Sequence, residues 1–232
     1  MYQNIDSIID DAPNVYKIPS REHGAGIATP APSNLYEVRD PDAQGNKLLS
    51  EEEREDYHTL TAKNLYLSKR GRPDLGTLIS FHCTRVQKAD LDDQKKLART
   101  IRHLISTKHL PLILKINEHG ITEWWVDASF AVHEDMKSRT GMRMGLGSGT
   151  IHVNSTKQKG NTSSSTHAEV VGVSDALPKM LWCRYFMEAQ GYLEDVYVYQ
   201  DNQSAILLEN NRCTINRKIL TAYQDKVFLY HR

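Results

Sequence analysis

Residues 121–129 read Ile-Thr-Glu-Trp-Trp-Val-Asp-Ala-Ser, a run rich in β-forming side chains that leads into an acid. This composition predicts a strand from Ile121 to Val126 that stops at Asp127. Two more strands are predicted downstream, at Arg139–Leu146 and Thr150–Ser155. The glycine-rich stretch between them, Gly145–Gly149, is typical of a hairpin turn. A polar loop of serines and threonines follows, over 155–165.

A long helix is predicted after this loop. Thr166-His167-Ala168-Glu169 has the form of a capping box, Gly191 marks the end, and Pro178 predicts a kink or a break near Ala176–Leu177. A strand at Val196–Tyr199 and a short helix at Ser204–Glu209 come next. The apolar spacing predicts this buried side of the long helix: Val170, Val173, Leu177, Leu181, Tyr185 and Met187. The resulting order, β-β-β-α-β-α, predicts an α/β domain with helices packed on a central sheet.

Three acids stand where α/β proteins place their sites, at strand ends and at a helix N-terminus. Asp127 ends the first strand, Glu169 lies in the first turn of the long helix, and Asp201 follows the fourth strand. Three converging carboxylates repel one another unless cations lie between them. Mg²⁺ binds carboxylates together with water and phosphate oxygens, and two such ions can promote phosphodiester cleavage.

Each acid also has an ordinary structural explanation. Glu169 fits the capping box, where an acid also suits the helix dipole. Asp201 can cap the next helix, and Asp127 can be a loop acid at a strand end. Spacing alone leaves both interpretations open.

The N-terminal half has a different character. Residues 1–50 are turn-rich and predict a poorly ordered connecting segment. Helices are predicted from Glu51 to near Gly71, with Ser50 as N-cap, then at Thr77–Val86, and again after Asp90. The third of these helices has an apolar stripe of Leu97, Ile101, Leu104 and Ile105. Its remaining surface is predicted to carry Lys95, Lys96, Arg99, Arg102 and His103.

Composition bounds the possible classes of protein. The chain has 232 residues, 39% of them hydrophobic and 25% charged, which excludes collagen-like and wholly disordered chains. The zero net charge hides an asymmetry: residues 1–60 carry 5 basic and 12 acidic side chains, and residues 61–110 carry 11 and 4. The basic segment suits either a nucleic acid or a solvated helix face. Short apolar runs predict no membrane span, and three scattered cysteines indicate an intracellular, reduced protein.

Four motifs follow one another along the chain: Trp125–Ser129, Ser155–Gln158, Ser164–Glu169 and Tyr199–Ala205. The series resembles the ribonuclease H domain of copia-type LTR retrotransposon Pol polyproteins. Upstream segments resemble the C-terminal end of the same family's reverse transcriptase. They are Leu65–Leu67, Arg72–Leu75, Arg85-Val86 and Thr107–Leu110.

The resemblance implies a ribonuclease H-like mixed sheet preceded by a mainly helical reverse-transcriptase segment. It divides the chain at 1–50, 51–118, 119–210 and 211–232, the last being a divergent tail. It implies that Asp127, Glu169 and Asp201 bind Mg²⁺ or Mn²⁺, two ions in a fully active site, with Asp127 shared. The implied substrate is the RNA strand of an RNA–DNA hybrid, met in the cytoplasm (in a virus-like particle) or in the nucleus. Candidate nucleic-acid contacts are Lys157, Gln158, Ser165, Asn202, Lys95 and Arg99, although Lys157 equally fits an exposed loop lysine.

Three departures from the family's pattern matter. The chain lacks a Tyr-x-Asp-Asp motif, since only Asp10-Asp11 and Asp92-Asp93 pair two aspartates without a tyrosine, so no polymerase activity is expected. His167 stands where the family usually has a glutamate. The tail, 211–232, does not match, which predicts a missing final strand and leaves Asp225 as a weak candidate for a fourth acid.

Two other interpretations stay open. The chain can be a truncated, non-catalytic retrotransposon remnant that at most binds nucleic acid. It can also be an α/β interaction module with no nucleic-acid role, which requires the motif series to be a coincidence.

Overall fold

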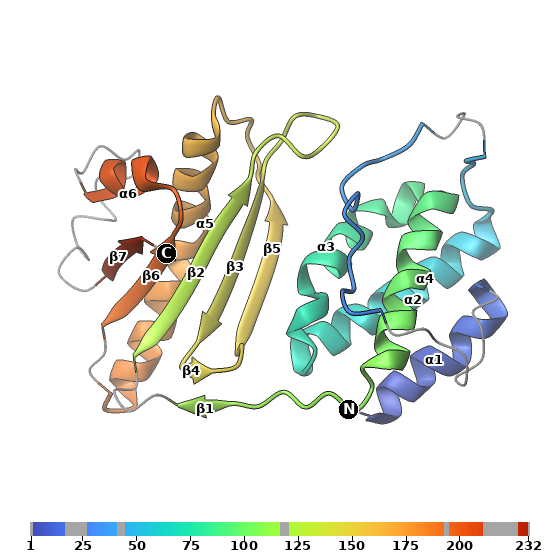
Figure 1. Ribbon diagram of the computed structural model, residues 1–232, viewed down its shortest axis with the longest axis horizontal. Helices are drawn as coiled ribbons and strands as arrows, with labels where there is room; N and C mark the ends of the chain where they lie inside the picture. Colours follow the sequence, from blue (N-terminus) through green and yellow to red (C-terminus); the bar gives the residue numbers. More distant parts are fainter. Residues whose placement is uncertain are drawn as a thin grey trace. The chain divides into compact units, whose positions relative to one another are not determined.

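The computed structural model (Figure 1) describes residues 2–16, 27–40, 45–116, 121–192, 195–210 and 227–231. The chain divides into two compact units, Met1–Leu112 and Ile113–Arg232. Each unit has a hydrophobic core of its own. None of the helices in the described ranges combines the length and the apolar character that crossing a membrane requires.

The first unit is helical. Its elements are α1 (Tyr2–Tyr16), α2 (Glu51–Arg70), η1 (Pro73–Leu75), α3 (Gly76–Arg85), η2 (Val86–Lys88) and α4 (Leu91–Ser106). The predicted bounds of α2 and α3 and the predicted start of α4 after Asp90 are confirmed to within one residue. The Ser50 hydroxyl accepts from the Glu53 backbone N–H and the Glu53 carboxylate accepts from Ser50 N–H, so the predicted capping box is present.

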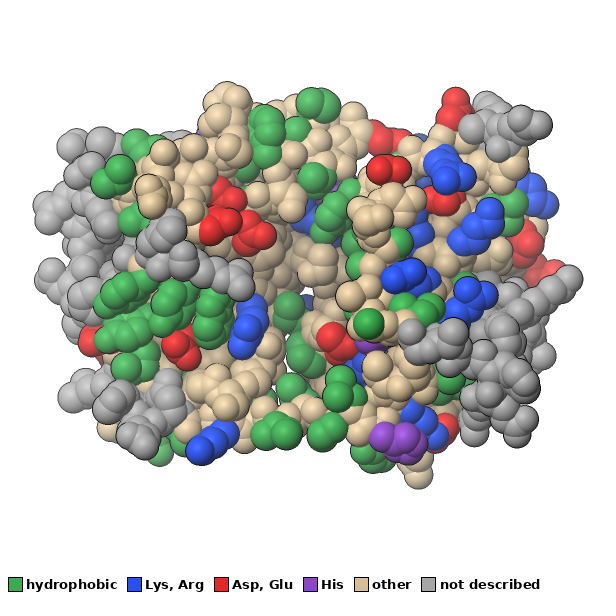
Figure 2. Space-filling model, viewed as in Figure 1, with side chains coloured by type: hydrophobic (Ala, Val, Ile, Leu, Met, Phe, Trp, Pro, Cys, Tyr) green, Lys and Arg blue, Asp and Glu red, His purple; other side chains and the backbone are tan. Residues whose placement is uncertain are grey.

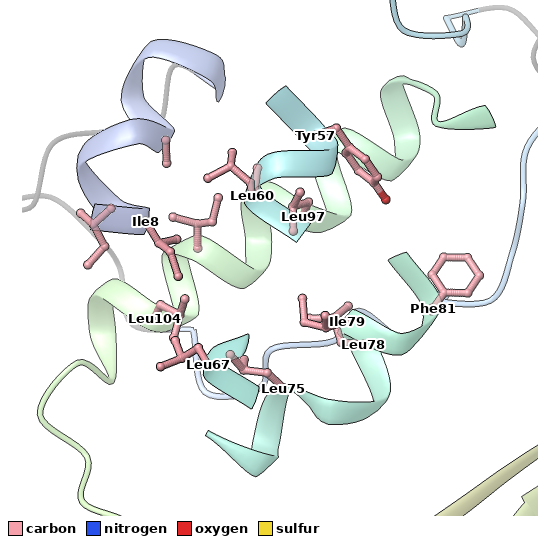
Figure 3. Close-up of a cluster of buried hydrophobic side chains, with 14 of the residues drawn as sticks. Ile8, Tyr57, Leu60, Leu67, Leu75, Leu78, Ile79, Phe81, Leu97 and Leu104 are labelled. Atoms are coloured by element: carbon pink, nitrogen blue, oxygen red, sulfur yellow. The ribbon is translucent and has the colours of Figure 1, made fainter. Parts of the chain in front are cut away.

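The core of this unit includes α1, a helix that was not predicted from the turn-rich N-terminal sequence. Ile5, Ile8 and Ile9 of α1 are buried with residues of α2, η1, α3 and α4 (Figure 3). The prediction of poor order over 1–50 is therefore wrong for Tyr2–Tyr16. The apolar residues that α1 contributes recur at helical spacing. The prediction was based on the turn-forming glycines and prolines of residues 1–50 and did not use this spacing.

The basic face of α4 is smaller than predicted. Lys95 and Arg102 are exposed, but Lys96 and His103 are each only 4% exposed. Lys96 Nζ donates to the carbonyl of Glu37, and His103 Nδ1 lies 2.7 Å from the carbonyl of Ile27. The segment 27–40 thus covers part of the surface that periodicity assigned to solvent.

The second unit is a mixed α/β layer. Its elements are β1 (Lys115–Ile116), β2 (Thr122–Ser129), β3 (Arg139–Gly145), β4 (Gly147–Ser148), β5 (His152–Lys157), α5 (Ser165–Ala189), β6 (Val196–Gln200), α6 (Gln203–Asn210) and β7 (Val227–His231). The main sheet has the order β5-β3-β2-β6-β7. β3 pairs antiparallel with β2 and β5, whereas β6 pairs parallel with β2 and β7. The predicted order β-β-β-α-β-α is confirmed, and β7 follows it.

Several local predictions need correction. β2 continues through Asp127 to Ser129. The predicted hairpin turn contains β4, which pairs with β1. Gly149 has a φ of +80°, and a Cβ there would lie 2.2 Å from the Ile113 carbonyl oxygen, so this position requires glycine. Helix α5 does not break at Pro178.

Helix α5 covers one face of the sheet, as Figure 1 shows. Trp124 and Val126 of β2 and Val198 of β6 pack there against α5 residues. Four of the six predicted buried positions of α5 are buried: Val170, Val173, Leu177 and Leu181. Met187 is partly buried, but Tyr185 is 47% exposed, so its prediction is wrong.

The C-terminal tail contributes a strand. β7 extends the sheet beside β6, with Val196 opposite Val227 and Gln200 opposite His231. The prediction of a C-terminally incomplete sheet without a final strand is therefore wrong. The weak fourth-acid candidate, Asp225, lies outside the described residues.

Candidate metal centre

The three acids singled out in the sequence come together in the second unit. Asp127 on β2, Glu169 on α5 and Asp201 after β6 each offer a carboxylate oxygen, and these oxygens all lie within 4.8 Å of one another. Asp127 and Asp201 are exposed, whereas Glu169 is 5% exposed. Figure 2 shows acidic side chains gathered over the sheet. Segments more than 70 residues apart in the sequence thus form one acidic cluster.

The ordinary explanations for these acids do not hold. Ser164, not Thr166, is the N-cap of α5, and its hydroxyl accepts from the His167 N–H, so Glu169 has no part in a capping box. Asn202, not Asp201, caps α6, with its Oδ1 accepting from Ala205 N–H at 2.9 Å. Asp127 lies within a strand and not in a loop. Helix capping accounts for neither of the two acids assigned to it.

Strand pairing explains why the acids can approach. The last pair between β2 and β6 is Trp125 with Tyr199, and β2 continues beyond it to Ser129. The N-terminal turns of α5 lie beside this part of the sheet, where Glu169 accepts from the Ala128 backbone N–H. A ligand site at the carboxyl ends of parallel strands is the expected position in α/β sheets.

Glu169 is also held by an amide that sequence reasoning missed. Gln200 is 1% exposed, and its Nε2 donates to Glu169 Oε2 at 3.1 Å. A signal was available, because Val196, Val198 and Gln200 alternate along β6 on its buried face. A polar residue at the end of such an alternation, beside a candidate ligand, marks a buried hydrogen-bonding group.

The cluster changes the protonation of its buried member. Burial raises the pKa of Glu169 to about 7, and the charges of Asp127 and Asp201 act in the same direction. The hydrogen bonds from Ala128 and Gln200 oppose this rise but do not cancel it. Near neutral pH, the protein without a cation therefore holds a carboxyl group that is readily protonated.

The ligand set suits a hard divalent cation. All three donors are carboxylate oxygens, which Mg²⁺, Mn²⁺ and Ca²⁺ prefer, whereas Zn²⁺ sites usually contain histidine or cysteine. With Mg²⁺–oxygen bonds of about 2.1 Å, two ligands of one ion lie at most about 4.2 Å apart. Small rotations of the exposed Asp127 and Asp201 side chains would close the present spacing, so the residues fit the implied metal.

The predicted nucleic-acid contacts in this unit have different surroundings. Lys157 and Ser165 are exposed, and Lys157 Nζ pairs with Asp135 at 2.8 Å. Gln158 is 2% exposed, and its Nε2 donates to Thr140 Oγ1 and to the Ala168 carbonyl. The prediction that Gln158 contacts a ligand is therefore wrong, because its side chain joins β3 to α5.

The other predicted nucleic-acid contacts, Asn202, Lys95 and Arg99, also differ in exposure and in hydrogen-bond partners. Asn202 caps α6, and its Nδ2 lies 3.5 Å from Thr166 Oγ1. Lys95 is exposed on α4, but Arg99 is half-buried and its Nη2 donates to Thr29 Oγ1 at 3.3 Å. Lys95 and Arg99 belong to the first unit and not to the acidic cluster.

Comparisons with known proteins yield little. No protein-family model matches the chain. Among solved structures, the chain is similar to LC11-RNase H1, which was isolated from compost by a metagenomic approach. The TM-score is 0.39 at 12% sequence identity, over 49% of this chain and 84% of that one. A similarity of this size assigns neither fold nor activity, so the candidate site rests on the geometry of this chain's own residues.

Proposed function

We propose that the second unit is a metal-dependent nuclease of the ribonuclease H type, which hydrolyses the RNA strand of RNA–DNA hybrids. The observation that carries this proposal is the meeting of three carboxylate oxygens within 4.8 Å at the carboxyl ends of β2 and β6. The order of strands and helices agrees with what the motif resemblance implies, which supports the same conclusion.

The chemistry follows from the donor set. Asp127, Glu169 and Asp201 would hold one or two divalent cations, Asp127 as the shared ligand, and Mg²⁺ or Mn²⁺ suits these oxygens. Bound there, such ions lower the pKa of water and offset the charge on a phosphodiester and its leaving oxygen. Exposed Asp127 and Asp201 face solvent, where a nucleic-acid backbone can approach, and buried Glu169 anchors the cluster from α5.

The partner is proposed to be an RNA–DNA hybrid bound through its backbone. Lys157 offers a cation and Ser165 a hydroxyl for phosphate and 2′-OH contacts. The motif series supports an origin in a copia-type Pol polyprotein. Reverse transcriptase activity is not part of the proposal, because the sequence lacks the Tyr-x-Asp-Asp motif.

The test is cleavage of an RNA–DNA hybrid labelled on the RNA strand by the purified full chain. We expect cleavage of that strand with Mg²⁺ or Mn²⁺, none with EDTA, and none of an all-DNA duplex. Asp127→Asn should abolish the reaction. Absence of metal-dependent cleavage would overturn the proposal. A hybrid that is shifted in a gel but stays intact would instead favour a non-catalytic nucleic-acid-binding remnant.

A further inference from the structure

Gln200 connects two of the three acids. Its Nε2 donates to Glu169 Oε2 at 3.1 Å, while its Oε1 accepts from the backbone N–H of Asp201 at 2.9 Å and of Asn202 at 3.3 Å. The side chain is 1% exposed. One buried amide therefore holds the carboxylate of Glu169 and the backbone that carries Asp201.

The orientation of this amide follows from its partners. Backbone N–H groups can only donate, so the oxygen of Gln200 must face Asp201 and Asn202. The NH₂ group must then face Glu169, whose carboxylate can accept. A flipped amide would put donors against donors and an oxygen against a carboxylate.

We propose that Gln200 is a positioning residue that sets the spacing between Glu169 and Asp201 for a divalent cation, an inference that rests on the proposed function. Metal-binding carboxylates need such partners, because a free side chain loses rotamer entropy when it binds. The Gln200 amide removes part of that freedom before a cation arrives. Its loss would leave Glu169 Oε2 without this donor and two backbone N–H groups without this acceptor.

The chain offers a matched control in Gln158. This amide is also buried in the second unit, at 2% exposed, and its Nε2 also makes two hydrogen bonds, at 3.0 Å to Thr140 Oγ1 and at 2.9 Å to the Ala168 carbonyl. Neither bond reaches a carboxylate. Gln158→Met and Gln200→Met therefore both remove a buried amide at nearly constant volume, but only the second removes a hydrogen bond to one of the three acids, since Gln158 bonds the backbone carbonyl of Ala168.

The experiment is a calorimetric titration of Mn²⁺ into the full chain and both variants, with tryptophan fluorescence as a check of folding. We expect Gln200→Met to weaken Mn²⁺ binding about 10- to 100-fold, the usual effect of losing a partner of a metal ligand. Gln158→Met should stay within about twofold of the wild-type affinity. Equal losses in both variants, or an unchanged affinity in Gln200→Met, would overturn the inference.

A second measurement needs no variant. In a ¹H–¹⁵N spectrum of the wild-type chain, the side-chain NH₂ signals of Gln200 should shift on addition of Mg²⁺, and by more than those of Gln158, which bonds none of the three carboxylates. Mg²⁺ binding without a shift at Gln200 overturns this inference alone. No binding of either metal by the wild-type chain overturns the proposed function, and the inference with it.

Discussion

Asp74 of the first unit lies against Arg72 and His103, whereas three acids of the second unit, Asp127, Glu169 and Asp201, lie against one another. Asp74 receives two hydrogen bonds from the Arg72 guanidinium, at 2.9 and 2.7 Å, and lies 3.1 Å from His103 Nε2. Burial alone would raise the pKa of Asp74, but Arg72 and His103 hold it below its usual range. In the second unit, burial and neighbouring acids raise the pKa of Glu169 to about 7.

The two pKa shifts, down for Asp74 and up for Glu169, have opposite consequences for folding. A carboxylate with a lowered pKa stabilises the folded unit, because folding favours its charged form. A carboxylate with a raised pKa costs folding free energy, and such costs concentrate at functional sites. Matched substitutions in the two units should therefore have opposite effects on stability and activity.

The largest expected effect is the loss of cleavage when the charge of Asp127 in the second unit is removed. Asp127→Asn should lower hybrid cleavage by more than about 100-fold, since a direct ligand matters more than its hydrogen-bond partners. It should leave the melting temperature of the second unit unchanged or higher, because it removes repulsion of Glu169. Cleavage rates and melting followed by tryptophan fluorescence measure both, since all three tryptophans (Trp124, Trp125 and Trp182) belong to the second unit.

The matched change in the first unit should behave in the opposite way. Asp74→Asn should cost about 1 kcal/mol of stability in the first unit, because Arg72 and His103 lose a charged acceptor. Cleavage should stay near the wild-type rate. Circular dichroism measures this loss, since α1 to α4 supply much of the helix signal. Loss of cleavage in a folded Asp74→Asn variant would contradict the assignment of Asp74 to stability alone.

A change of pH should affect the stability of the two units with opposite signs. Burial lowers the pKa of His82 to about 3, and Lys96 and Arg85 contribute. Between about pH 6.5 and about 3 the unfolded chain binds a proton at residue 82 that the folded chain does not. As the pH falls through this range, His82 therefore lowers the free energy of unfolding of the first unit by about 1.4 kcal/mol per pH unit. His82→Gln should reduce that slope in denaturant titrations followed by circular dichroism.

The second unit should respond in the other direction where Glu169 titrates. Between about pH 4.5 and about 7 the folded state binds a proton at Glu169 that the unfolded chain has released, so this group favours folding as the pH falls. Tryptophan fluorescence during urea unfolding, without metal, measures the effect. Glu169→Gln should abolish it, and an unaltered pH response in that variant would contradict the assignment.

The smallest expected effect concerns nucleic-acid contact. Lys157→Gln should weaken hybrid binding only a few-fold, because Lys157 already pairs with Asp135, and the loss should shrink as salt rises. Lys95→Gln is the matched change on the first unit's exposed surface. Gel shifts at two salt concentrations compare them. A larger loss for Lys95 would assign the contact surface to the first unit.

Sequence reasoning predicted what depends on local spacing. The cap of α2, the order of strands and helices along the second unit and the three acids follow from residues close in the chain or from a linear motif series. Spacing could not find what depends on distant contacts, such as the burial of Lys96 and His103 under segment 27–40. For the same reason Gln158 was predicted to contact a nucleic acid, although its side chain bonds partners on β3 and α5.

Contacts between distant residues also limited what could be predicted about the candidate metal site. Glu169 was identified, but its capping explanation stayed open until the structure identified Ser164 as the N-cap. Gln200 was missed because its importance comes from Glu169, 31 residues away. Residue type and spacing predict which groups can bind a cation, and alternation along β6 indicates that Gln200 is buried, but its contact with Glu169 is known only from the folded arrangement.

Asp127, Glu169 and Asp201 are proposed to form one cation site. A calorimetric titration of Mn²⁺ into the full chain tests it most directly, with Asp127→Asn and Asp74→Asn titrated in parallel. We expect saturable binding by the wild-type chain and by Asp74→Asn, and binding at least about 10-fold weaker in Asp127→Asn. Saturable binding that Asp127→Asn leaves unchanged, or no binding by the folded wild-type chain, would contradict it.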